Sequence, residues 1–207
     1  MVRSPKKKIA KKITELRAKL WPDLSPDDLW HRNAYDGFTS IPRTMPLIMN
    51  IIDDLAPGSK KTAMTYLALW GHAFDEMYVS LQKADELAFH AGYTGQRAVR
   101  SWKERMRELA NLGFIRLASG TAGELSHAVI VNPHFVIRRL YAAKTPGLTA
   151  AAYNALVERA IAISADDMST TLPEDVPETA EEAEEDDSGQ TAPVSKAFAA
   201  LLKKRSL

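Results

Sequence analysis

Basic and amide side chains recur along one predicted helix in the middle of the chain, over residues 94–111. Its apolar residues have the spacing of a single helix face that we expect to pack into the core: Val99, Trp102, Met106 and Leu109. The other side then presents hydrogen-bond donors, and residues 94–107 hold five basic residues and one acid. A helix fits the major groove of DNA, where arginine pairs twice with guanine and glutamine with adenine.

Cations beside such a helix can hold phosphates and fix its register on DNA. Arg116 lies on the predicted strand that follows, and residues 119–121 form the tip of a predicted hairpin that is poor in basic residues. The expected DNA-contacting side chains of this region are Gln96, Arg97, Arg100, Ser101, Lys103, Arg107 and Arg116. Lys6, Lys7 and Lys8 of the N-terminal segment join them as expected phosphate contacts.

The charge of the chain is strongly segregated. The 207 residues carry a formal net charge of +1, but residues 1–159 hold 23 basic and 15 acidic residues, a charge of +8. Residues 160–195 hold eleven acidic residues and no Lys or Arg, whereas residues 196–207 carry +4. The net charge of the whole chain therefore hides a basic body, residues 1–159. A basic body is typical of nucleic-acid-binding proteins.

Both ends of the chain have distinct patterns. Residues 3–12 hold six basic residues and no acid, and Ile9, Ile13, Leu16 and Leu20 share one face of a predicted helix from Lys6 to Trp21. This helix can contact phosphate or pack on the body, and a membrane-surface role is the weaker alternative because its apolar side lacks aromatics before Trp21. No apolar segment follows the N-terminal charges, so a signal peptide is not expected.

The acidic segment 166–195 is predicted to be a disordered linker, because it cannot bury enough apolar surface to offset its ordering entropy. It can serve solubility alone or compete with DNA phosphates for the basic body. Residues 196–207 are expected to form a short basic helix or tail that can dock on a protein partner. The predicted organisation is thus a basic N-terminal helix or arm (1–22), a core domain (23–165), the linker and this end piece.

The predicted elements of the core are mainly helical. Helices are expected at 26–32, 45–55, 60–77, 82–90, 94–111, 133–143 and 150–163, and extended segments at 78–81, 114–117 and 127–131. Met64, Leu67, Trp70 and Phe74 form the expected buried stripe of helix 60–77. Gly113 is expected to end helix 94–111 in the left-handed conformation. A helix, a turn, a second helix and then a β-hairpin predict an α+β winged helix-turn-helix with flanking helices.

Two stretches of the chain resemble the sequence pattern of a known protein family. Asp85-Glu86-Leu87-Ala88 and Ala91-Gly92-Tyr93-Thr94 match a first helix and turn, and Leu109-Ala110-Asn111-Leu112-Gly113-Phe114-Ile115 matches the close of a second helix. Over residues 82–132 the chain resembles bacterial winged helix-turn-helix DNA-binding proteins of plasmids and integrative mobile elements. The resemblance implies recognition of double-stranded DNA by the second helix. The segment from Thr94 to Gly113 is about one turn longer than the common pattern.

Several kinds of chemistry are not expected. The chain has no cysteine, which excludes disulfides, thiol nucleophiles and cysteine metal sites. Its five histidines have no ligand spacing, Gly92-Tyr93-Thr94-Gly95 lacks the features of a P-loop, and no apolar run is long enough to span a bilayer. We expect no enzyme activity, no cofactor, no metal and no membrane partner.

The sequence therefore predicts a cytoplasmic, nucleoid-associated DNA-binding protein, a transcriptional regulator of a plasmid or other mobile element. A plasmid replication-initiation factor is one alternative, and a winged-helix adaptor subunit that binds protein partners is another. The alanine-rich helices 133–143 and 150–163 finish the core or mediate a homodimer.

Overall fold

The computed structural model describes residues 5–32, 34–59, 61–74, 76–121 and 123–171, with the backbone alone for 5–10, 26 and 59. The helices are α1 Pro5–Leu20, α2 Met45–Leu55, α3 Ala63–His72, α4 Ala84–His90, α5 Ala98–Asn111, α6 Pro133–Ala142 and α7 Ala150–Ala162. The strands are β1 Tyr78–Ser80, β2 Ile115–Gly120 and β3 Gly123–Ile130, and short 3-10 helices cover Pro26–Asp28 and Pro57–Ser59. The expected mainly helical α+β fold is confirmed.

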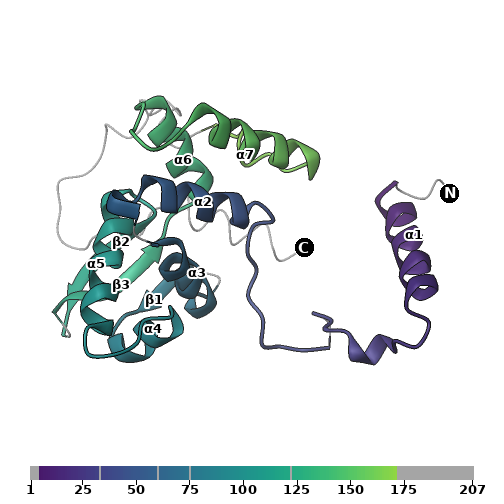
Figure 1. The fold of residues 1–207 in the computed structure, drawn as a ribbon, viewed down its shortest axis with the longest axis horizontal. Coiled ribbons are helices and arrows are strands. Elements are labelled where there is room, and N and C mark those ends of the chain that lie inside the picture. The colour runs from purple at the N-terminus through teal and green to yellow at the C-terminus, as the bar shows by residue number, and fades with distance from the viewer. Residues whose placement is uncertain (1–4, 33, 60, 75, 122, 172–207) are drawn as a thin grey trace, which may run out of the picture. The chain divides into compact units, whose positions relative to one another are not determined.

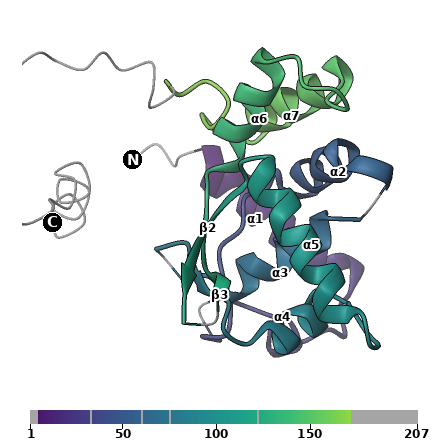
Figure 2. The same cartoon turned by 90° about the vertical axis from the view of Figure 1, so that its left-hand side faces the viewer.

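The three strands form one antiparallel sheet in the order β1-β3-β2. Val79 of β1 pairs with Ala128 of β3, which in turn pairs with Leu117 of β2. Helices α3, α4 and α5 lie together on one side of this sheet, α6 and α7 lie at its end, and α2 contacts both α3 and α7 (Figures 1 and 2). Strand alternation matches this arrangement, because Val79, Ala128 and Ile115 are buried while Tyr78 and Val129 are exposed.

The core joins α2, α3, α5 and the inner face of the sheet. Trp102 of α5 and Tyr66 of α3 are buried, and the Tyr66 ring meets Phe114 edge-to-face with centroids 5.6 Å apart. Burial raises the pKa of the Tyr66 phenol well above its ordinary range. Three of the four residues predicted for the buried face of helix 94–111 are buried as expected, and Val99 is half-buried: Trp102, Met106 and Leu109 form the buried set.

The prediction for helix 60–77 is wrong in both length and face. The Asp53 carboxylate accepts hydrogen bonds from the backbone N–H groups of Thr62 (2.7 Å) and Ala63 (2.8 Å), so α3 begins at Ala63. Its buried residues are Ala63, Thr65, Tyr66, Leu69 and Trp70. Of the predicted stripe only Trp70 is buried; Met64 is 50% exposed and Phe74, beyond the end of the helix, 86%.

Other boundaries differ for local reasons. Residues 29–32 are not helical, because a single helical turn at Pro26–Asp28 makes too few hydrogen bonds to propagate by itself. The hairpin turn is shorter than predicted, since Gly120 pairs with Gly123. Of the apolar side predicted for helix 150–163 (Tyr153, Leu156 and Ile161), Leu156 is buried and Tyr153 packs against the core, but Ile161 is 71% exposed and Ala160 is buried instead. The Thr149 hydroxyl caps α7 by accepting from Ala152 N at 3.1 Å.

The start of the predicted linker is ordered. The carbonyl oxygen of Asp166 accepts hydrogen bonds from the hydroxyls of Ser169 and Thr170, and Met168 packs against the core. The prediction of disorder from residue 166 is therefore wrong for 166–170, because these residues bond to one another and to α6. The rest of that linker and the predicted end piece at 196–207 lie outside the described residues.

Candidate functional site

Helix α5 is fixed in the core on one side and exposed on the other. Trp102, Met106 and Leu109 anchor it, while its outward residues recur at i, i+4, i+7 and i+11: Arg100, Glu104, Arg107 and Asn111. It contacts α4, which precedes it through a turn in which Gly92 and Gly95 both have positive φ (86° and 79°). This packing holds the orientation of α5 independently of its outward side chains.

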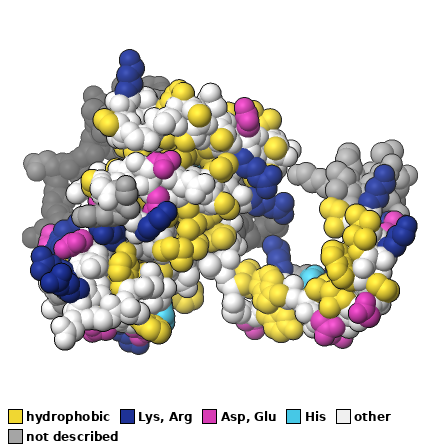
Figure 3. Space-filling model, viewed as in Figure 1, with side chains coloured by type: hydrophobic (Ala, Val, Ile, Leu, Met, Phe, Trp, Pro, Cys, Tyr) yellow, Lys and Arg dark blue, Asp and Glu magenta, His cyan; other side chains and the backbone are white. Residues whose placement is uncertain are grey.

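The structure brings together three of the predicted cations. Val99, Arg100, Lys103, Glu104 and Arg107 line one shallow depression of about 410 Å3 on the exposed side of α5. Figure 3 shows Lys and Arg side chains gathered beside acidic ones over this part of the surface. The depression is open and charged, which suits an extended polyanion better than a small apolar ligand.

Two of these arginines already contact carboxylates. Arg100 Nε lies 3.3 Å from Glu104 Oε1 one turn along the helix, and Arg107 Nη2 lies 3.2 Å from Glu124 Oε2 of β3. Glu124 was not among the predicted site residues. Its position depends on the hairpin register, which no local pattern around residue 124 specifies.

Gln96 and Arg97 are exposed, but they are not on the helix as predicted. Gly95 has φ 79° and Arg97 is the N-cap of α5, so the turn occupies residues 94–97 and the helix starts four residues later. Thr94 therefore lies before the helix, and the backbone N–H of Ala98 donates to Gly95 O at 3.1 Å. Ser101 and Lys103 are half-buried on the two flanks of the exposed stripe.

Arg116 lies near the other end of α5. It is exposed at the start of β2, opposite Val129, and lines a separate depression with Asn111 and Arg139. With 14 residues at 1.5 Å each, α5 is about 20 Å long, so Arg116 is not gathered with Arg97 and Arg100. Lys6, Lys7 and Lys8 belong to α1, but their side chains lie outside the described residues.

The hairpin beyond α5 has little charge of its own. Ser119 sits at an irregularity in the β2–β3 pairing, and the Ser126 hydroxyl donates to Gly123 O at 2.8 Å. A Cβ at Gly120 would come within 2.6 Å of His127 Nε2 and 2.9 Å of Ser126 Cβ, so a larger residue there would displace these side chains. The described tip residues include no Lys or Arg, as the sequence predicts.

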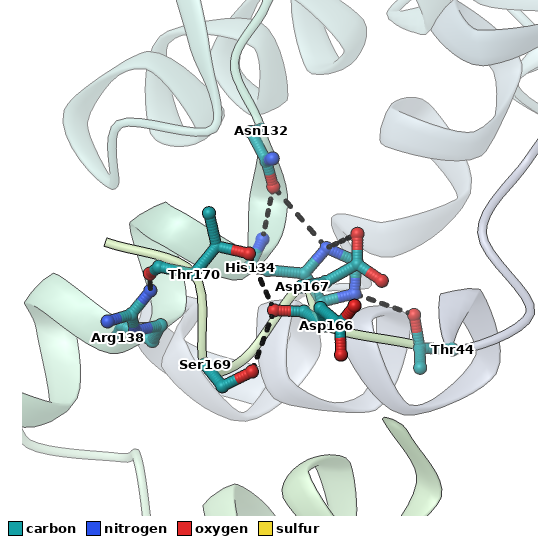
Figure 4. A network of polar contacts seen from close by, with 8 residues as sticks. All are labelled: Thr44, Asn132, His134, Arg138, Asp166, Asp167, Ser169 and Thr170. Atoms are coloured by element: carbon teal, nitrogen blue, oxygen red, sulfur yellow. Dashed lines mark hydrogen bonds and ion pairs between the residues drawn. The ribbon is translucent and has the colours of Figure 1, made fainter. Parts of the chain in front are cut away.

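A second polar cluster surrounds His134 at the start of α6 (Figure 4). His134 is buried, its Nε2 lies 2.8 Å from Thr44 Oγ1, and Asn132 Oδ1 accepts from the His134 backbone N–H at 3.0 Å. Asp167 Oδ1 lies 3.8 Å from its Nδ1. Burial lowers the pKa of His134, and the nearby Asp167 carboxylate opposes that shift.

Arg138, one turn along α6, donates to the backbone carbonyl of Thr170. The cluster therefore also holds residues 166–170 against α6. No signal in the sequence links His134 to residues 44 and 167, since the three lie far apart along the chain.

His72 and His90 form a second histidine contact that sequence spacing did not indicate. Their rings stack with centroids 5.0 Å apart, and His72 Nε2 lies 2.9 Å from His90 Nδ1. Burial, with the neighbouring His90, lowers the pKa of His72, while Glu86 opposes the shift. No group of three or more acidic or histidine side chains among the described residues has the arrangement of a metal site.

Comparison with known proteins finds no protein family, no curated protein and no solved structure that matches this chain. Within the described ranges, every helix is too short or too polar to cross a lipid bilayer. The functional argument therefore rests on the side chains themselves.

Proposed function

We propose that this chain binds double-stranded DNA, with α5 in the major groove. One observation carries the proposal: the outward side of α5 bears Arg100, Lys103 and Arg107 with Arg97 at its start, while the inward side is fixed in the core. A helix held in this way can enter a groove without losing its packing. Its arginines then pair with guanine or with phosphate oxygens.

The arrangement around α5 supports a winged helix-turn-helix as the form of this DNA-binding unit. The elements follow the order α3, β1, α4, α5, β2, β3, and α4 contacts α5, to which residues 91–97 connect it. In this assignment the β2–β3 hairpin is the wing. Beginning α5 at residue 98 also removes the extra turn that the sequence pattern implied.

For the biological role we propose transcriptional regulation on a plasmid or other mobile element, in the cytoplasm and at the nucleoid, by binding and not by catalysis. This role rests on the resemblance of residues 82–132 stated above. Replication initiation at such an element is the alternative role for the same surface. An adaptor subunit, in which α5 contacts a protein, is the alternative of a different kind.

The experiment is selection of bound sequences from a random duplex pool, followed by affinity measurement on the selected duplex at several salt concentrations. Arg97→Ala and Arg100→Ala should each strongly weaken binding to the selected duplex while the circular dichroism spectrum is unchanged, because both side chains are exposed. A lost bidentate base contact is worth about 1–3 kcal/mol, or roughly 5- to 150-fold in affinity. For the parent protein, the logarithm of affinity should fall steeply with that of salt concentration as counterions are released.

Lys61→Ala is the matched control, because Lys61 is an exposed cation that contacts Asp53 near the start of α3 and does not line the α5 depression. It should leave the affinity close to that of the parent. If both arginine variants bind the selected duplex as well as the parent does, the assignment of α5 is wrong. If no duplex is selected at all, the adaptor role replaces DNA binding.

A further inference from the structure

The segment before α2 exposes an unusual amount of apolar surface. Nine large hydrophobic side chains between residues 13 and 41 are exposed: Ile13, Leu16, Leu20, Trp21, Leu24, Trp30, Tyr35, Phe38 and Ile41. Figure 3 shows hydrophobic side chains along α1 and the segment that follows it. Contiguous exposed apolar surface of this extent marks an interaction site.

An apolar groove lies where this segment joins the body. It has a volume of about 610 Å3 and is lined by residues of the α2 entry, α2, α3 and α7: Ile41, Pro42, Arg43, Met45, Pro46, Met49, Asn50, Leu67 and Arg159. Six of these nine residues are apolar, and two of the six are methionines, whose flexible side chains adapt to a bound group. The two arginines are exposed.

The stretch from Trp21 to Asp28 has the complementary composition. Trp21 and Leu24 are exposed apolar residues, and the acidic residues of the same stretch are Asp23, Asp27 and Asp28. A tryptophan beside carboxylates matches a groove with an apolar floor and arginines, because the ring can be buried while the charges pair outside it. The basic residues of α1 precede this stretch.

We propose that two copies of this chain form a dimer by exchanging this segment, with Trp21 and Leu24 of each copy in the α2–α3–α7 groove of the other. In the single chain both surfaces stay exposed, and the groove wall includes Ile41 and Pro42, through which the segment enters the body. In a two-fold exchange, the segment of each copy covers the groove of the other, so both segments and both grooves are buried. At roughly 80 Å2 for each half-exposed side chain, the nine expose about 700 Å2, so an exchange that covers all of them as well as the groove approaches the ~800 Å2 per partner of a stable interface.

The chain contains no cysteine, so engineered cysteines give an unambiguous cross-linking test. Leu24→Cys and Asn50→Cys are made separately in the full-length chain, one of them with a mass tag, mixed under reducing conditions and then oxidised. A disulfide between the tagged and untagged chains is the expected result. Ala18→Cys, on the side of α1 opposite Leu16 and Leu20, replaces Leu24→Cys as the control and should give none.

Sedimentation of the chain without added cysteines supplies the second measurement. The parent should be dimeric with a concentration-dependent dissociation. Trp21→Ala should weaken the dimer at least tenfold without changing the circular dichroism spectrum, since Trp21 is 56% exposed. Ile161→Ala removes a similarly exposed apolar side chain that does not line the groove and should leave the dimer intact.

Two outcomes would overturn the proposal. One is a parent chain that sediments as a monomer at all concentrations and gives no interchain disulfide. The other is a Leu24→Cys, Asn50→Cys double variant that closes a disulfide within one chain while the mixed single variants give none, which would mean that the segment binds its own groove. Neither outcome bears on whether α5 binds DNA.

Discussion

Helix α5 carries an arginine–glutamate ion pair on each of two sides, and the N–O distances of the two pairs are nearly the same. On the outward side Arg100 lies 3.3 Å from Glu104, with side chains 81% and 44% exposed. Toward the body Arg105 lies 3.2 Å from Glu108, with side chains only 13% and 12% exposed. The Thr62 hydroxyl also donates to Glu108 Oε2 at 3.1 Å, which ties α5 to the start of α3.

Distance alone therefore does not show what an ion pair does in this protein. An exposed pair competes with water and salt and contributes about 0–1 kcal/mol, so its arginine remains available to a partner. A pair removed from water leaves an uncompensated charge when one member is deleted, which costs about 3–5 kcal/mol. Thus the same two residue types offer a binding surface on one side and a structural link on the other.

The largest expected effect comes from the inward pair. Glu108→Ala should lower the free energy of unfolding by about 3 kcal/mol, because Arg105 and Thr62 lose their shared acceptor away from water. Urea unfolding followed by circular dichroism measures the loss. Glu104→Ala, the matched change on the outward side, should cost no more than about 0.5 kcal/mol. Equal losses in the two variants would abolish the distinction between the sides.

A change in pH tests a buried polar group outside α5, the His134 imidazole at the start of α6. Burial lowers the pKa of His134 below its ordinary value of 6.5, so below that pH the unfolded chain binds a proton that the folded chain binds less readily. Stability should therefore fall as the pH drops below about 6.5, by about 1 kcal/mol for each pH unit. Thermal unfolding between pH 5 and pH 8 measures the dependence.

His134→Gln keeps a polar group near Thr44 but cannot titrate, so the variant should show a shallower pH dependence than the parent. The residual slope is expected from His72, whose pKa is also lowered by burial. An unchanged slope in His134→Gln would remove His134 from the explanation.

The smallest expected effect is on the outward side and rests on the proposed DNA binding. Glu124→Gln removes the carboxylate charge next to Arg107, so affinity for the selected duplex should rise about two- to fivefold, with stability changed by less than about 0.5 kcal/mol. The gain should shrink as salt rises, because exposed charges are screened. Glu158→Gln, the same charge change on α7, should leave affinity unchanged; a similar gain there would point to net charge alone.

Local patterns predicted much of this fold. The bounds of α2 match the prediction, those of α6 and α7 match within one residue, and the core face of α5 was read from the spacing of Trp102, Met106 and Leu109. These features depend on neighbours in the sequence: apolar periodicity, prolines and glycines. The start of α3 could not be read in this way, because it depends on the Asp53 carboxylate ten residues upstream.

The α+β composition, the amphipathic α5 and the separation of charge along the chain all follow from residue type and spacing. Which cations can meet a partner depends instead on how the chain folds. The folded chain pairs Arg105 with Glu108 away from water, places Arg116 at the other end of α5, and brings Glu124 to Arg107 through the hairpin register. The physical reason is that solvent exposure and long-range pairing, which set the strength of a charge interaction, depend on segments that meet only in the folded chain.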